Sequence, residues 1–70
     1  GDGDLAAAVA LLKLDTEIYP DSWNAFDSLG EAYAKVGDKP RAVAAYRQSL
    51  VLNPKNTNGV EQLRLLGAQP

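Results

Sequence analysis

The sequence contains no cysteine, no histidine and no methionine among its 70 residues. It therefore offers no disulfide bond, no thiol nucleophile and no histidine for a metal site or a catalytic triad. No apolar run reaches the roughly 18 residues that a membrane span needs, because Lys13, Asp15 and Glu17 interrupt the longest one. The first residues also lack the basic and apolar pattern of a secretory signal. With neither kind of segment in this chain, we expect a cytoplasmic location by default.

Motifs that carry chemistry are missing as well. The sequence has no G-x-S-x-G, S-x-x-K or H-E-x-x-H pattern and no phosphate-binding loop. Asp2 and Asp4 are similar to the start of a calcium-binding loop, but alanines and leucines follow where further oxygen ligands are needed. The five aromatic residues show no alternation with bases that would suit stacking on nucleic acid. We therefore predict a protein that is not an enzyme and that takes no cofactor, no metal ion, no nucleic acid and no membrane.

What the sequence does contain is the composition of one small globular domain. Hydrophobic residues make up 46% of the chain and charged residues 23%, which argues against disorder. The net charge of −2 conceals an uneven distribution, because residues 1–31 carry −6 and residues 32–70 carry +4. This polarity could steer association with a partner or a second copy, although an ordinary solvated surface is the simpler explanation.

Glycine and proline divide the chain into segments with helical periodicity. We predict helices over residues 5–18, 23–36, 39–52 and 57–66. The first three begin after side chains that can cap free amides, namely Asp4, Ser22 and Asp38. The fourth has two candidate caps, Asn56 and Asn58, and Asn58 forms a capping-box pattern with Glu61. No segment shows the alternation of a strand, so we expect an all-α fold.

The first predicted helix is apolar on two sides. One stripe consists of Leu5, Val9, Leu12 and Thr16. The other consists of Leu11, Leu14 and Ile18. A helix of this kind belongs between two neighbours, so we expect one stripe to lack a cover within the chain. Either stripe could then support a homodimer.

The residues that separate the predicted helices recur with a period of 34 positions. Three short segments recur at this shift: Gly3-Asp4 as Gly37-Asp38, Ala8-Val9-Ala10 as Ala42-Val43-Ala44, and Tyr19-Pro20 as Asn53-Pro54. A period of this length is typical of helical repeat proteins.

The segment from Trp23 to Asn56 resembles one complete tetratricopeptide repeat (TPR). The resemblance rests on large and small side chains at eight positions: Phe26, Leu29, Gly30, Tyr33, Ala42, Tyr46, Ser49 and Pro54. It implies that the large residues fill the space between paired helices, that the small ones allow close approach, and that the proline sets the next turn. Residues 3–22 resemble the second helix of a preceding repeat, and residues 57–67 resemble a C-terminal capping helix.

Two positions depart from the repeat pattern. Asp15 stands where a small residue is usual, and Arg64 replaces the glycine that is matched by Gly30. Both substitutions are typical of elements at the edge of an array. We therefore expect a short α-solenoid of about four antiparallel helices that does not continue past Arg64.

The resemblance implies a protein-interaction module or scaffold with a concave groove. It places six residues along that groove: Asn24, Asp27, Glu31, Lys35, Asn58 and Glu61. Helical spacing independently puts Asn24, Asp27 and Glu31 on one polar face. Because acids stand where a carboxylate clamp would need bases, we expect a basic or polar partner rather than an acidic one.

Three alternatives remain at this stage. So short a module could bind nothing alone. It could be an accessory tail of an enzyme, since residues 19–24 and 53–56 are similar to TPR tails that follow serine hydrolases of the β-lactamase-related kind. It could also be a purely structural unit that forms homodimers.

Overall fold

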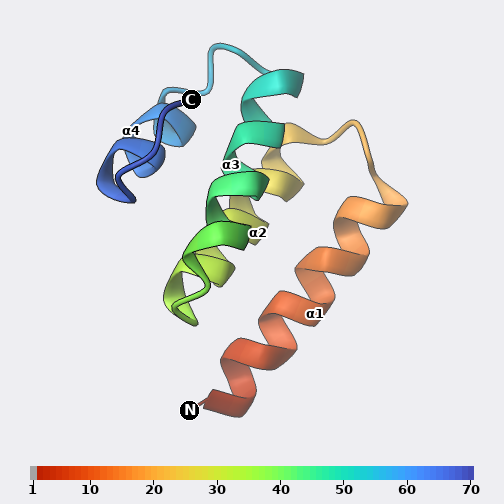
Figure 1. Cartoon of the computed structure of the whole chain (residues 1–70). Helices are drawn as coiled ribbons and strands as arrows, with labels where there is room; N and C mark the ends of the chain where they lie inside the picture. The colour runs from red at the N-terminus through yellow and green to blue at the C-terminus, as the bar shows by residue number, and fades with distance from the viewer. Residues whose placement is uncertain (1) are drawn as a thin grey trace.

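A computed structural model describes residues 2–70, with side chains from Asp4 onward, and shows four α-helices (Figure 1). Their bounds are Asp2–Ile18 for α1, Trp23–Lys35 for α2, Lys39–Leu52 for α3 and Thr57–Leu65 for α4. No strand occurs within residues 2–70, so the predicted all-α class is confirmed. None of these helices combines the length and the apolar character that crossing a membrane requires.

The helices form a flat array. Helix α2 packs between α1 and α3, and α4 packs against α3. Short turns join consecutive helices, so neighbours run antiparallel along the array (Figure 1). The principal extents of 32 × 27 × 15 Å describe a flat molecule about one helix pair thick. This arrangement leaves two broad faces open to solvent.

Two helix starts follow the predicted capping chemistry. The Ser22 hydroxyl accepts a hydrogen bond from the Ala25 amide at 3.2 Å, and the Asp38 carboxylate accepts one from the Arg41 amide at 3.3 Å. Gly37 follows α2 with a φ of +84°, in the left-handed region where a side chain would be strained. These helix ends could be predicted from the sequence because each depends on residues within four positions of the helix end.

The predicted start of the first helix is wrong. We expected Asp4 to cap a helix from Leu5, but α1 already begins at Asp2 and Asp4 lies inside it. The alanines at positions 6–8 favour helix strongly enough to extend it backwards. An acidic side chain in a first turn is still stabilised by the helix dipole.

The fourth helix begins at one of its two predicted caps, but without the predicted capping bonds. Asn56 holds the N-cap position, but its side chain makes no capping hydrogen bond. Asn58 and Glu61 do not form the expected capping box, because their side chains bond to Asp27 and Arg64 instead. In each case a tertiary or i,i+3 partner competes successfully with the free amides.

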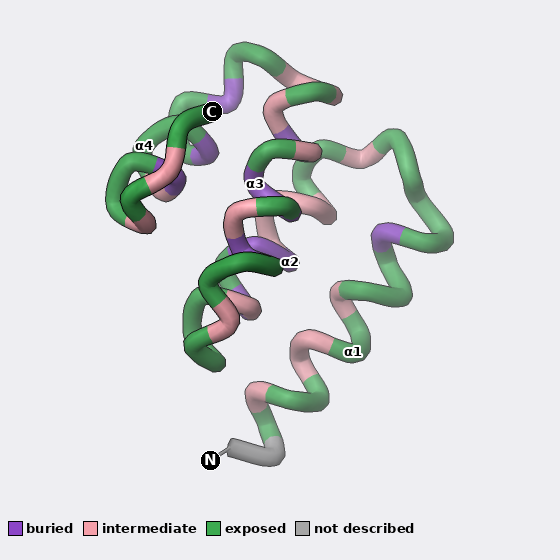
Figure 2. Tube along the Cα trace, in the orientation of Figure 1, coloured by how far each residue is buried: buried purple, intermediate pink, exposed green. Residues whose placement is uncertain are grey.

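The core lies where α2, α3 and α4 meet. Tyr46 and Leu63 are its largest fully buried side chains, and Ala42 and Ser49 are buried beside them. The Tyr46 ring approaches Gly30 so closely that a Cβ on that glycine would lie 2.9 Å from ring carbons. Figure 2 shows the buried stretches concentrated in α2, α3 and α4, whereas most of α1 is exposed.

Candidate partner-binding face

The candidate face is the polar side of α2 together with the start of α4. Helix α2 buries Leu29 and Ala32 on its inner side. Its opposite side carries the four predicted residues that recur at helical spacing: Asn24, Asp27, Glu31 and Lys35. The amphipathic pattern of α2 therefore fixes the direction of these side chains.

Asp27 is the point where α2 and α4 meet on this face. Its Oδ2 accepts hydrogen bonds from Asn56 Nδ2 at 2.8 Å and from Asn58 Nδ2 at 3.1 Å. Its Oδ1 accepts from the same Asn58 nitrogen at 3.1 Å. The structure thus brings together two predicted residues, Asp27 and Asn58, that are 31 positions apart.

Asn56 belongs to the same network, although the sequence predicted it only as a helix cap. Its side chain is buried, and Nδ2 also donates to Ser49 Oγ at 3.2 Å. Ser49 in turn donates to the Tyr46 carbonyl oxygen at 2.6 Å. Asn56, at the start of α4, is therefore hydrogen-bonded to both α2 and α3. No local pattern distinguishes an asparagine that caps its own helix from one that turns inward.

The other two acids of the face form ion pairs on their own helices. Glu31 Oε1 lies 3.0 Å from Lys35 Nζ, and Glu61 Oε1 lies 2.6 Å from Arg64. The hydrogen bond from Arg64 lowers the pKa of the Glu61 carboxyl from its usual value. The positive charges of Lys35 and Arg64 therefore offset two of the three negative charges on this face. Among the described residues, Asp27 is the acid of the face whose hydrogen-bond partners are only neutral amides.

A buried tyrosine lies beneath these carboxylates. Burial, together with the negative charges of Asp27 and Glu31, raises the pKa of Tyr46 to about 12. The two carboxylates on the face therefore act electrostatically on the core side chain of α3.

A hollow adjoins the polar face where α1 passes α2. It has a volume of about 340 Å³. One wall is apolar and comes from α1, namely Leu5, Ala8 and Leu12, and the other comes from α2 and includes Glu31 and Lys35. The charged pair of α2 thus borders a space that suits an apolar side chain.

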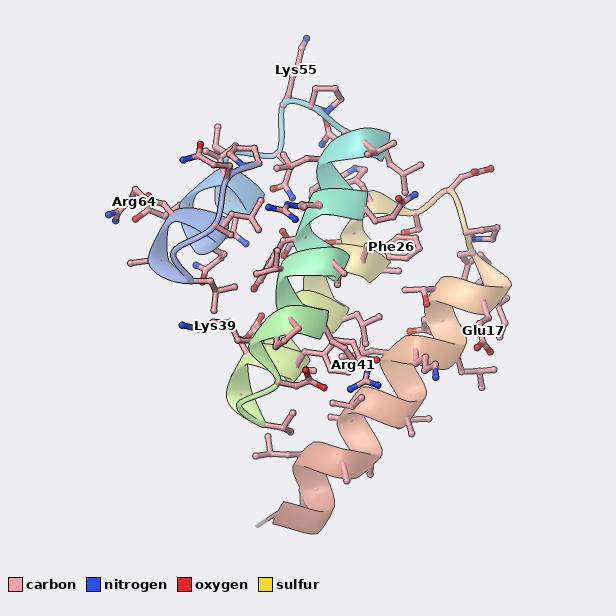
Figure 3. The ribbon with its side chains drawn as sticks, viewed as in Figure 1. Glu17, Phe26, Lys39, Arg41, Lys55 and Arg64 are labelled. Atoms are coloured by element: carbon pink, nitrogen blue, oxygen red, sulfur yellow. The ribbon has the colours of Figure 1, made fainter. Side chains whose placement is uncertain are left out.

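A second hollow of about 320 Å³ lies across α2, between α1 and α3. Phe26 and Tyr33 contribute to its wall, with Arg41 at its edge. Figure 3 shows Phe26 and Arg41 turned toward α1. Among the described residues, no three acidic, cysteine or histidine side chains gather as they would around a metal ion.

Comparison with known protein families gives a match for the central helix pair. Residues 23–56, which span α2 and α3, match the family model described as tetratricopeptide repeat. A search of curated proteins found no match. TPR repeats generally serve as protein-interaction modules and are typically non-catalytic, and no catalytic family matches this chain. The predicted relation to tails of serine hydrolases is not tested by this match and stays a prediction.

Proposed function

We propose that this TPR module binds a partner protein through the α2–α4 face, and that it recognises a basic or polar segment carrying an apolar side chain. The observation that carries the proposal is the environment of Asp27. Its carboxylate is fixed by neutral amides from Asn56 and Asn58, and it stands half-buried on a face lined with polar side chains.

The charge of Asp27 is available to a partner because amide donors orient a carboxylate without neutralising it. A lysine or arginine side chain of the partner would supply the missing positive charge, and hydrogen bonds to an ionised group are stronger than neutral ones. Asn24, exposed one turn earlier on α2, can bond to the partner's main chain. A partner that ends in a free carboxylate finds no such match, because Lys35 is already paired with Glu31.

The hollow beside Glu31 and Lys35 accounts for the apolar part of the ligand. Leu5, Ala8 and Leu12 form its far wall. Covering this apolar surface with a leucine-sized side chain gains roughly 25 cal/mol for each Å² removed from water. A segment with one apolar residue next to a base would therefore use both features of the face.

Peptide binding measured by fluorescence anisotropy tests the proposal. Three labelled peptides of equal length are compared: a basic one with a leucine, the same one with that leucine replaced by serine, and an acidic one with a free C-terminus. We expect the first to bind most tightly and its affinity to fall with added salt, since exposed charges are screened over about 10 Å at 0.1 M. Tighter binding of the acidic peptide would refute the proposed charge preference.

A matched pair of variants locates the binding surface. Glu31→Gln and Glu17→Gln remove the same charge, but Glu17 lies on α1, on the side away from α2 (Figure 3). We expect Glu31→Gln to weaken binding of the basic peptide by roughly two- to five-fold, as for one exposed charge contact. Glu17→Gln should leave the affinity unchanged. Equal effects of the two variants would mean that net charge, not this face, governs binding.

A further inference from the structure

Asn58 and Gly59 form the one Asn-Gly pair in the sequence. The side chain of an asparagine in such a pair is prone to lose ammonia, because the next main-chain nitrogen can attack its Cγ atom and close a succinimide ring. Glycine makes this attack easy, since it has no side chain to obstruct the ring and readily adopts unusual backbone conformations. The other asparagines are followed by bulkier residues, namely Ala25, Pro54 and Thr57.

The packing of α4 explains why a glycine follows Asn58. A Cβ on Gly59 would lie 2.9 Å from Asn56 Nδ2 and 3.2 Å from Ser49 Oγ. These two atoms are hydrogen-bonded to one another, and Asn56 Nδ2 also donates to Asp27. A larger residue at position 59 would push into this buried network. The packing of α4 therefore imposes the reactive Asn-Gly pair.

The start of α4 is weakly held, which gives the reaction an opportunity. Val60 donates to the Asn56 carbonyl oxygen across 3.4 Å, and the Gly59 amide, one residue earlier, belongs to the first-turn N–H groups that have no acceptor in their own helix. Helix α4 is 9 residues long and lies at one end of the array (Figure 1). So short a helix is marginal without its packing, and such segments open locally far more often than the whole protein unfolds. When this end opens, the Asn58 side chain leaves Asp27 and its Cγ atom comes within reach of the Gly59 nitrogen.

We propose that Asn58 is a site of spontaneous deamidation, and that the product weakens the contact between α4 and α2. In the first step the Gly59 nitrogen bonds to Asn58 Cγ, the bond from Cγ to Nδ2 breaks, and ammonia leaves with the proton of the Gly59 amide. Water then opens the succinimide ring, so that one carbonyl carbon gains a hydroxyl group and the nitrogen regains a proton. The product is aspartate or isoaspartate at position 58, which is ionised at neutral pH.

The new carboxylate faces Asp27. In the intact protein Asn58 Nδ2 donates to both carboxylate oxygens of Asp27 at 3.1 Å. An ionised carboxyl group has no donor, so both bonds are lost and two negative charges come together. The isoaspartate form also adds a methylene group to the main chain in the first turn of α4, which disturbs the helix start. The deamidated chain therefore holds this end of α4 to α2 less firmly.

Peptide mapping by mass spectrometry tests the site. The full chain is incubated in mildly alkaline buffer, both folded and unfolded in urea, and is digested at intervals. We expect Asn58 to be converted in both samples, more slowly in the folded one, while Asn24, Asn53 and Asn56 stay amides over the same period. Gly59→Ala should slow the reaction in urea, where the packing around position 59 has no influence. An Asn58 that is still intact in the folded protein after the unfolded chain has been fully converted would overturn the proposed site.

A double-mutant cycle tests the consequence. Asn58→Asp introduces the charge of the product, and Asn58→Ala is the matched control that removes the same hydrogen bonds without adding a charge. We expect Asn58→Asp to lower the folding equilibrium constant by roughly three- to ten-fold, more than Asn58→Ala, in urea denaturation. In an Asp27→Asn background Asn58→Asp should be neutral or stabilising, because an amide at position 27 can donate to the carboxylate and an acid suits the first turn of a helix. A loss in that background as large as in the parent would overturn the proposed repulsion from Asp27.

Discussion

The ring of Tyr46 occupies the space that a side chain on Gly30 would need. A Cβ on Gly30 would lie 2.9 Å from two ring carbons, closer than nonbonded carbon atoms pack. The absence of a side chain on α2 is therefore what allows an aromatic residue of α3 to fill the core of the repeat.

Replacing Gly30 with alanine should destabilise the protein. The helix propensity of alanine favours the change, but the ring must move to relieve the overlap, and overpacking of this kind costs about 1–3 kcal/mol. Urea denaturation followed by circular dichroism gives the free energy of unfolding. A stability equal to that of the parent would contradict the close contact.

A double-mutant cycle separates this contact from any other effect of the alanine. Tyr46→Leu alone should be destabilising, by roughly 2–4 kcal/mol for a truncated core aromatic. In the Tyr46→Leu background, Gly30→Ala should cost less than in the parent, because the clashing ring is gone. Strict additivity of the two substitutions would argue against a direct interaction.

The fold of the central repeat could be predicted because its signals are local or periodic. Ser22 and Asp38 cap their helices through bonds that span three residues, and Gly37 ends α2 by its own backbone conformation. The start of α1 was missed because several alanines together outweighed one capping residue. A sum of weak helix propensities shifts a boundary without leaving a distinct mark in the sequence.

The raised pKa of Tyr46 should make the stability of the protein sensitive to alkaline pH. Its pKa is about 12 in the folded state, raised mainly by burial and then by Asp27 and Glu31, against about 10 for an exposed tyrosine. The protonated hydroxyl is thus favoured by folding. Its contribution is complete below pH 10 and is lost progressively as the pH rises toward 12.

Tyr46→Phe provides the comparison for this pH dependence. Both proteins contain the same lysines and the same other tyrosines, so their remaining alkaline titrations cancel in a difference. We expect the free energy of unfolding of the parent to fall relative to that of Tyr46→Phe between pH 10 and 12, as measured by urea titrations at each pH. Parallel curves would show that the hydroxyl titrates normally.

Asn56 should contribute more to stability than its place at a helix start suggests. Asn56→Ala removes the donor to the half-buried Asp27 carboxylate and to the buried Ser49 hydroxyl, and the loss of such bonds costs about 1–3 kcal/mol. Asn58→Ala is the control, because Asn58 is exposed and its bonds to Asp27 can be replaced by water. We expect thermal unfolding to show a clearly larger loss for Asn56→Ala than for Asn58→Ala. Equal losses would show that the hydrogen bonds of Asn56 contribute no more to stability than those of Asn58.

The candidate face was only partly predictable for a related reason. The spacing of Asn24, Asp27 and Glu31 fixes their common side of α2, and the Glu31–Lys35 pair follows from a separation of four residues. The bonds from Asn56 and Asn58 to Asp27 span 29 and 31 positions, so no local pattern encodes them. These bonds depend on the position of the start of α4 relative to α2, which is set by the packing of the helices.

The cap of α3 should make the protein sensitive to acid. The side-chain hydrogen bond from Arg41, at 2.7 Å, is the main cause that lowers the pKa of Asp38 below its usual value. A carboxyl with a lowered pKa in the folded state stabilises the protein above its unfolded pKa, and this stabilisation is lost as the pH falls through the folded pKa. Asp38→Asn retains an oxygen that can cap the helix but does not titrate in this range. We therefore expect the parent to lose more stability than Asp38→Asn between about pH 5 and pH 2, in urea titrations across this range. Identical acid profiles would show that the cap acts through its hydrogen bond to the Arg41 amide and not through its charge.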